Sequence, residues 1–166
     1  MAVSCGIGMA FDMASTERTC RLLIVDDDEV DRRLYSRLLT RQVPGAFEIV
    51  QAKDGVTGLA ALREQNPDCV LLDFHLPDMT GFEFVSNAAV GCELPCAVVI
   101  ITGQGNEALA VDAMKLGIQD YLAKDQITAS SLRRSVTTAV TQTELRQSLA
   151  ARCVTSPPQT PHWNTR

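Results

Sequence analysis

Short apolar runs alternate along the chain with longer segments in which apolar residues recur every three or four positions. The runs lie at 22–25, 47–50, 69–72, 98–101 and 120–123. A short continuous run suits a buried strand, and the longer spacing favours an amphipathic helix. Helices are expected between Asp28 and Pro44, between Asp54 and Asn66, around Phe82 to Ala89, from about Asn106 to Leu116, and from about Ser130 to Leu149.

Five strands that alternate with five helices predict an α/β domain whose parallel sheet is covered by helices on both faces. The runs at 22–25, 69–72 and 98–101 suit central strands, whereas 47–50 alternates more, as an edge strand does. The apolar spacing assigns a buried face to the first two helices. The residues expected there are Val30, Leu34 and Leu38 in the first helix, and Val56, Leu59 and Leu62 in the second.

Composition narrows the class of protein. The 166 residues fit one domain, and a hydrophobic content of 46% is enough for a core. A net charge of −5 argues against a nucleic-acid-binding surface. No apolar stretch is long enough to span a bilayer, and the start lacks the features of a secretory signal, so a cytoplasmic location is expected. The six cysteines form no Cys-x-x-Cys pair, so neither a thiolate metal site nor a disulfide framework is expected.

Four of the apolar runs end in polar residues of the kind that phosphoryl transfer uses. These residues are Asp26 and Asp27, then Asp73, Thr102 and Lys124. The carboxyl ends of parallel strands share one edge of the sheet, so these side chains should meet where the strand order reverses, between the first and third strands. An acid after a strand is often only a helix cap, which is our interpretation of Asp28. Four matching strand ends together favour a functional site.

The residue types indicate how such a site would work. Three carboxylates cannot crowd together ionised without a cation, and oxygen ligands of this kind suit Mg²⁺. A carboxylate can also attack phosphorus and form an acyl phosphate. Asp73 is the best candidate nucleophile because it stands alone at its strand end, whereas Asp26 and Asp27 form a pair suited to metal. Lys124 and Thr102 would bind phosphoryl oxygens.

Over about residues 20 to 149 the chain resembles the receiver domain of two-component response regulators. The matching motifs are Ile24-Val25-Asp26-Asp27-Asp28, the segment from Leu71 to Gly81, Ile101-Thr102-Gly103, and Asp120-Tyr121-Leu122-Ala123-Lys124. The resemblance implies a doubly wound, flavodoxin-like sheet in the order 2-1-3-4-5. It also implies that Asp73 accepts phosphate from a histidine kinase or phosphotransfer protein. Mg²⁺ would be held by Asp26, Asp27, Asp73 and the backbone carbonyl of His75.

By the same resemblance, Thr102 and Tyr121 form a switch pair. The pair would report phosphorylation to the face made by the fourth helix (106–116), the fifth strand (120–123) and the fifth helix (130–149), where an unidentified downstream protein would bind. His75 and Gln104 would flank the path of the water that hydrolyses the acyl phosphate, and we expect His75 to hinder it. Such a domain promotes its own phosphorylation and dephosphorylation but is not otherwise an enzyme. Neither a nucleic-acid partner nor a membrane is expected, and a homodimer is left open.

One position departs from the family pattern. Receiver domains usually have proline after the lysine, and this chain has Asp125. A non-proline cis peptide bond costs ~3 kcal/mol, so the Lys124–Asp125 bond is expected to be trans.

Two alternative functions stand beside that of a receiver switch. A haloacid-dehalogenase-type phosphatase also uses a strand-end Asp with Mg²⁺, but it needs a second Asp where this chain has His75. A receiver that serves only as a passive interaction module is disfavoured by the intact acids and Lys124.

The chain could also be a fragment of a larger regulator or of a hybrid kinase. We expect a flexible N-terminal extension at 1–19, the receiver domain at 20–149, and a disordered tail or linker stub at 150–166. Leu145 and Leu149 lie beyond what a sheet would cover, and either a frayed helix end or a helix that meets a partner would explain them.

Overall fold

Five parallel strands form one sheet in the order β2-β1-β3-β4-β5 in the computed structural model, which describes residues 19–42, 44–91, 93–103 and 117–154. The strands are β1 (Cys20–Val25), β2 (Phe47–Ala52), β3 (Cys69–Asp73), β4 (Ala97–Thr102) and β5 (Asp120–Ala123). Every strand expected from the apolar runs is present. β2 lies at the edge of the sheet, as its alternating pattern predicted.

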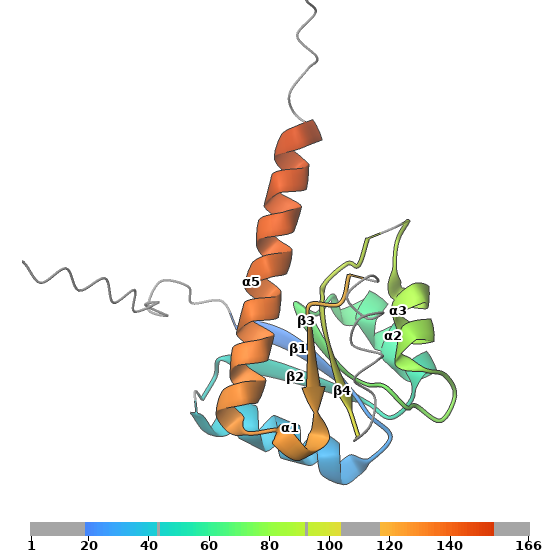
Figure 1. The fold of residues 1–166 in the computed structure, drawn as a ribbon, viewed down its shortest axis with the longest axis vertical. Helices are drawn as coiled ribbons and strands as arrows, with labels where there is room; N and C mark the ends of the chain where they lie inside the picture. Colours follow the sequence, from blue (N-terminus) through green and yellow to red (C-terminus); the bar gives the residue numbers. More distant parts are fainter. Residues whose placement is uncertain (1–18, 43, 92, 104–116, 155–166) are drawn as a thin grey trace, which may run out of the picture.

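Helices cover both faces of this sheet, so the fold is doubly wound and flavodoxin-like as expected. The helices are α1 (Glu29–Gln42), α2 (Gly55–Gln65), α3 (Gly81–Ala88) and α5 (Ala129–Val154), and a short 3-10 turn, η2 (Lys124–Gln126), follows β5. Figure 1 shows α1 and α5 on one face and α2 and α3 on the other. The helix expected at 106–116 falls outside the described residues.

Alternate residues of the central strands supply two separate cores. Successive side chains of a strand point to opposite faces, so a continuous apolar strand serves both faces at once. In β1, Leu22 and Ile24 face the core formed with α1 and α5, whereas Leu23 and Val25 face the core formed with α2 and α3. All four are essentially inaccessible to solvent. The sheet is thereby packed on both faces, and the residues that follow its strands lie together at its carboxyl edge.

The predicted buried faces of α1 and α2 are partly wrong. Val30 is 71% exposed and Val56 is 64% exposed, and Leu34 is also exposed. In α1 the buried side chains are Tyr35 and Leu39. A helix with apolar residues all along it carries overlapping stripes, and spacing alone does not say which stripe turns to the sheet. The prediction holds in α2 for Leu59 and Leu62, which are buried.

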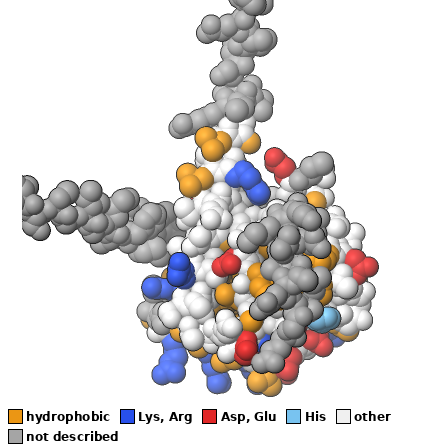
Figure 2. All heavy atoms as spheres, in the orientation of Figure 1, with side chains coloured by type: hydrophobic (Ala, Val, Ile, Leu, Met, Phe, Trp, Pro, Cys, Tyr) orange, Lys and Arg blue, Asp and Glu red, His pale blue; other side chains and the backbone are white. Residues whose placement is uncertain are grey.

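The last helix runs further than predicted. It was expected to end near Leu149, and α5 continues to Val154, five residues into the segment expected to be a tail. Alanines at 150 and 151 favour helix, and the first proline comes only at 157. Leu145 and Leu149 are exposed there, and Figure 2 shows hydrophobic side chains on the part of α5 that projects from the domain. Within the described ranges, no helix combines the length and apolarity needed to cross a membrane.

Candidate functional site

Three of the predicted acids meet at the carboxyl edge of the sheet. Val25 of β1 pairs with Leu72 of β3, so Asp26 and Asp73, the next residue of each strand, leave the sheet side by side. One carboxylate oxygen from each of Asp26, Asp27 and Asp73 lies within 4.8 Å of the other two. Asp26 and Asp73 are 1% and 6% exposed, whereas Asp27 is exposed. The site therefore has two buried carboxylates and one that faces solvent.

The loop that carries Asp26 and Asp27 is fixed by the helix that follows it. Asp28 Oδ1 accepts the Val30 N–H at 2.7 Å, so Asp28 caps α1 as the sequence predicted. The Asp28 N–H donates to Asp26 Oδ1 at 2.8 Å. Arg32 Nη1 donates to the carbonyl oxygens of Asp26 and Asp27 at 2.6 and 3.1 Å. These hydrogen bonds hold the backbone that carries Asp26 and Asp27, together with one carboxylate oxygen of Asp26.

Lys124 reaches the acids from the far side of β4. Ala123 of β5 pairs with Thr102 of β4, so Lys124 leaves the sheet at the same edge, and its long side chain extends past the end of β4. Its Nζ donates to Asp26 Oδ2 at 3.0 Å and to Asp73 Oδ2 at 2.8 Å. It also donates to Asp31 Oδ2 at 2.8 Å. Asp31 was not among the site residues predicted from the sequence, because it lies in the first turn of α1 rather than at a strand end.

The electrostatics of this cluster favour a further positive charge. Burial raises the pKa of Asp26 to about 6, against the lowering effect of hydrogen bonds from Lys124 and Asp28, and the nearby charge of Asp73 adds to the increase. Burial tends to lower the pKa of Lys124, but its hydrogen bonds to Asp31, Asp73 and Asp26 outweigh this and raise it above its usual range. Three carboxylates thus contact one ammonium group, and a fourth, that of Asp27, lies beside two of them. An all-oxygen set of this kind is chemically suited to Mg²⁺.

The predicted switch residues lie on the two strands nearest Lys124. Thr102 is fully buried at the end of β4, and its Oγ1 donates to the carbonyl of Gly103 at 3.2 Å. Tyr121 is half-buried on β5 and packs against the core on the α2 and α3 side. Thr102 is thus at the predicted edge, but its hydroxyl is directed to its own loop in this state. Gln104, predicted for the rim of the site, falls outside the described residues.

The loop after β3 is held on both sides. The exposed His75 donates its backbone N–H to Asp73 Oδ1 at 3.2 Å, so both oxygens of Asp73 are engaged. Further along the loop, Asp78 accepts the N–H groups of Gly55 and Val56 at 2.8 and 2.9 Å. Asp78 therefore ties this loop to the start of α2, a role with no signal in the sequence pattern.

One local prediction at the site is confirmed. The Lys124–Asp125 peptide bond is trans, as expected without proline. At the start of α2, Asp54 accepts the Thr57 N–H at 2.8 Å and so caps that helix.

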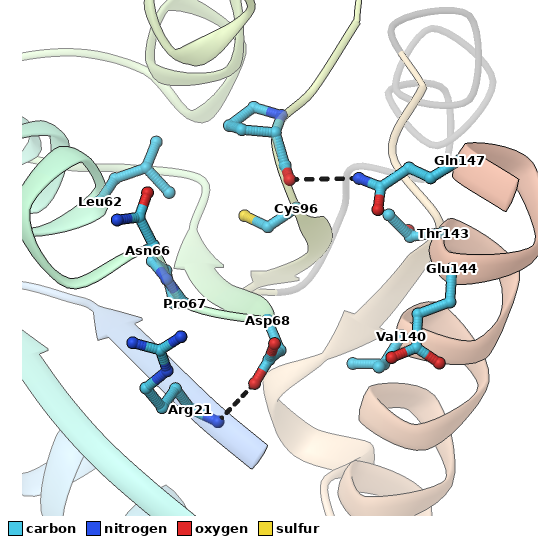
Figure 3. Close-up of a pocket in the computed structure, with 11 residues that line it drawn as sticks. Arg21, Leu62, Asn66, Pro67, Asp68, Cys96, Val140, Thr143, Glu144 and Gln147 are labelled. Carbon is cyan, nitrogen blue, oxygen red and sulfur yellow. Dashed lines mark hydrogen bonds between the residues drawn. The ribbon is translucent and has the colours of Figure 1, made fainter. Parts of the chain in front are cut away.

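A hollow lies at the opposite, amino edge of the sheet. It encloses about 300 Å³ between the starts of β1, β3 and β4 and the side of α5. In Figure 3, the Arg21 backbone N–H donates to Asp68 Oδ2 at 2.8 Å, and Gln147 Nε2 donates to the Pro95 carbonyl at 3.3 Å. Thr143 lines this hollow, and its buried Oγ1 has no hydrogen-bond partner among the described residues. The hollow is far from the strand-end acids and has no part in their chemistry.

Comparison with known proteins agrees with the fold. The model of the response regulator receiver domain matches residues 22–137, so the chain belongs to that family of two-component signalling domains. It is 33% identical over 117 residues to protein-glutamate methylesterase/protein-glutamine glutaminase 2 of Anaeromyxobacter dehalogenans, a match that covers 70% of this chain and 33% of that protein. It is 32% identical over 130 residues to transcriptional regulatory protein SrrA of Staphylococcus aureus, covering 74% of this chain and 52% of SrrA.

A solved receiver domain has the same fold. The crystal structure of the signal receiver domain of a Luxo repressor protein from Vibrio parahaemolyticus superposes with a TM-score of 0.70 at 26% identity, covering 80% of this chain and 98% of that one. The chain spans between a third and about half of the length of the two curated relatives, whereas it matches nearly the whole of this isolated receiver domain.

Proposed function

We propose that this chain is a phosphorylation-controlled switch in which Asp73 accepts a phosphoryl group from a histidine kinase or a phosphotransfer protein. The observation that carries the proposal is the contact of Lys124 Nζ with Asp73 Oδ2 at 2.8 Å, inside a cluster of acids on a receiver fold. Asp73 ends the fully buried strand β3, and no other acid lies at that strand end. Asp26 and Asp27 lie together and are better placed to hold metal.

The reaction is a displacement at phosphorus. A carboxylate oxygen of Asp73 forms the new O–P bond, the bond between phosphorus and the donor breaks, and the donor leaves with that electron pair. With a phosphohistidine donor the leaving group is the imidazole, which takes up a proton, and with acetyl phosphate it is acetate. Lys124 stabilises negative charge on the phosphoryl oxygens. Asp26 and Asp27 keep their carboxylates free of covalent change.

Mg²⁺ is the cofactor that this donor set fits. Asp26, Asp27 and Asp73 would hold it with their carboxylates, together with the backbone carbonyl of His75. A bound Mg²⁺ would offset the charge of the acids and of the phosphoryl group. The cluster supports this proposal, because it holds four acids and one ammonium: Asp26, Asp31 and Asp73 contact Lys124, and Asp27 lies beside Asp26 and Asp73.

Replacing one acid of the neighbouring pair separates the metal site from the helix cap. Asp27→Ala should weaken Mg²⁺ binding at least about tenfold, because a hard cation loses a charged oxygen ligand. Asp28→Ala removes the α1 cap and should cost about 1 kcal/mol of stability, yet leave Mg²⁺ affinity close to that of the wild type. A fluorescence or calorimetric Mg²⁺ titration compares the two variants. Coincident titration curves would show that the division of roles within the triplet is wrong.

The output side of the switch is also a proposal. Phosphorylation would move Thr102 and Tyr121 and so alter the face that includes β5 and α5, where a downstream protein would bind. The two longer relatives are named as a methylesterase/glutaminase and as a transcriptional regulatory protein, and those activities belong to whole proteins of which this chain matches a part. At the rim of the site, His75 and Gln104 would set how long the phosphoryl group survives.

The domain division stays a prediction. We assign 1–19 to an N-terminal extension, 20–149 to the receiver domain and 150–166 to a tail or linker stub, with α5 reaching five residues into that last segment.

The direct test is phosphorylation by a small donor. We expect the protein to gain the mass of one phosphoryl group when it is incubated with acetyl phosphate and Mg²⁺, and to gain none when EDTA removes the metal. Intact-mass spectrometry measures both. Uptake that is unaffected by EDTA would count against the metal-assisted site.

A further inference from the structure

Asp31 is a third carboxylate on the Lys124 ammonium, and it comes from a different element than the other two. It lies in the first turn of α1, and its Oδ2 is 2.8 Å from Lys124 Nζ, as close as that of Asp73. The side chains of Asp31 and Lys124 are each 27% exposed. Asp31 is therefore the most exposed of the three carboxylates that contact the ammonium, since Asp26 is 1% and Asp73 6% exposed.

The hydrogen-bonding capacity of Lys124 is fully used by these contacts. An ammonium group has three N–H donors. Asp26, Asp31 and Asp73 accept them at 3.0, 2.8 and 2.8 Å. A phosphoryl oxygen that binds Lys124 must therefore displace one of the three carboxylates. Asp26 is the most buried of them and is also held by the Asp28 N–H, and Asp73 is the acceptor itself. Asp31 is the carboxylate that can give way.

We propose that Asp31 is a positioning residue that competes with the phosphoryl group for the Lys124 ammonium and thereby slows phosphorylation of Asp73. The inference rests on the proposed function. Asp31 makes and breaks no covalent bond. The O–P bond forms at Asp73, the donor leaves with its electron pair, and one N–H of Lys124 moves its hydrogen bond from Asp31 Oδ2 to a phosphoryl oxygen. The negative charge of Asp31 also repels the anionic donor, and both effects act in the same direction.

The decisive variant is Asp31→Asn, which keeps the size of the side chain and one acceptor oxygen but removes the charge. The initial rate of labelling by acetyl phosphate at saturating Mg²⁺ should rise about three- to fivefold, the size expected for a partly exposed ion pair. Mg²⁺ affinity should fall slightly in the same variant, because the pocket loses a negative charge. Damage to the fold would slow labelling, so faster labelling with weaker metal binding is specific to the proposed competition. Asp31→Glu keeps a charge beside the ammonium and should label close to the wild-type rate.

Glu29→Gln is the matched control. It removes one negative charge from the same turn of α1, but Glu29 pairs with Arg33 at 2.6 Å on the exposed side of the helix. Its labelling rate should equal that of the wild type, and equal acceleration in both variants would overturn the inference in favour of a general charge effect. If the wild type is labelled and Asp31→Asn is labelled no faster, the inference is overturned but the proposed function is not. A wild type that takes up no phosphoryl group would overturn the proposed function and the inference with it.

Discussion

Asp73→Asn abolishes the uptake of a phosphoryl group from acetyl phosphate. The amide keeps the shape of the side chain and an oxygen that can accept the His75 N–H, so the loop after β3 keeps its hydrogen bond. It lacks the carboxylate electron pair that forms the O–P bond. We expect no mass increase under conditions in which the wild type is fully labelled, as measured by intact-mass spectrometry.

The control for this variant is Asp68, which precedes the same strand. Asp68 immediately precedes β3 at the opposite edge of the sheet, where it accepts the Arg21 N–H at 2.8 Å. Asp68→Asn makes the same chemical change there and should leave labelling at the wild-type level. Labelling that persists in Asp73→Asn would move the acceptor to Asp26 or Asp27 and would reverse the assignment of metal ligand and nucleophile.

Phe84→Ala lowers the free energy of unfolding by about 3–5 kcal/mol. Phe84 is fully buried on α3, in the core between the sheet and α2. The neighbouring turn of α2 carries Gly58, where an added Cβ would lie 2.9 Å from the Phe84 ring. A glycine has no side chain that could move into the space left by the ring, so the cavity should stay open. Since the free energy of unfolding of a single domain is about 5–15 kcal/mol, the expected loss is a large part of the total stability.

Urea denaturation followed by circular dichroism measures this loss. Val90→Ala is the surface control, because Val90 is 76% exposed, and it should change the unfolding free energy by less than about 0.5 kcal/mol. The denaturant slope should stay constant in both variants if only stability changes. A loss below about 1 kcal/mol for Phe84→Ala would mean that α3 does not pack against α2 as described.

The elements that the sequence predicted best are those whose pattern has one physical explanation. A run such as Val98 to Ile101 is apolar at every position, and within an α/β alternation that pattern fits a strand buried on both faces. The sheet also determines where the polar residues after such runs lie, because parallel strands all end at the same edge. Asp26, Asp73 and Lys124 could therefore be brought together from the sequence before any contact was known.

The buried face of a helix was harder to predict, because more than one apolar stripe can fit the same sequence. Val30 and Leu34 fit an apolar stripe as well as Tyr35 and Leu39 do, and only packing against β1 and α5 decides which stripe is buried. Asp31 was missed for a related reason. An acid in the first turn of a helix is explained sufficiently by the helix dipole, so nothing in the sequence distinguishes it from a surface residue.

The length of α5 has a mechanical consequence. One face of the helix is buried as far as Thr143, and the residues from Glu144 to Ala150 are all exposed. From Val136, which packs in the core, to Val154 the helix rises about 27 Å, so each degree of tilt about Val136 displaces its far end by about 0.5 Å. Figure 1 shows that the end of α5 extends well beyond the sheet. A change of a few degrees where α5 meets the sheet thus becomes a displacement longer than a covalent bond at Val154.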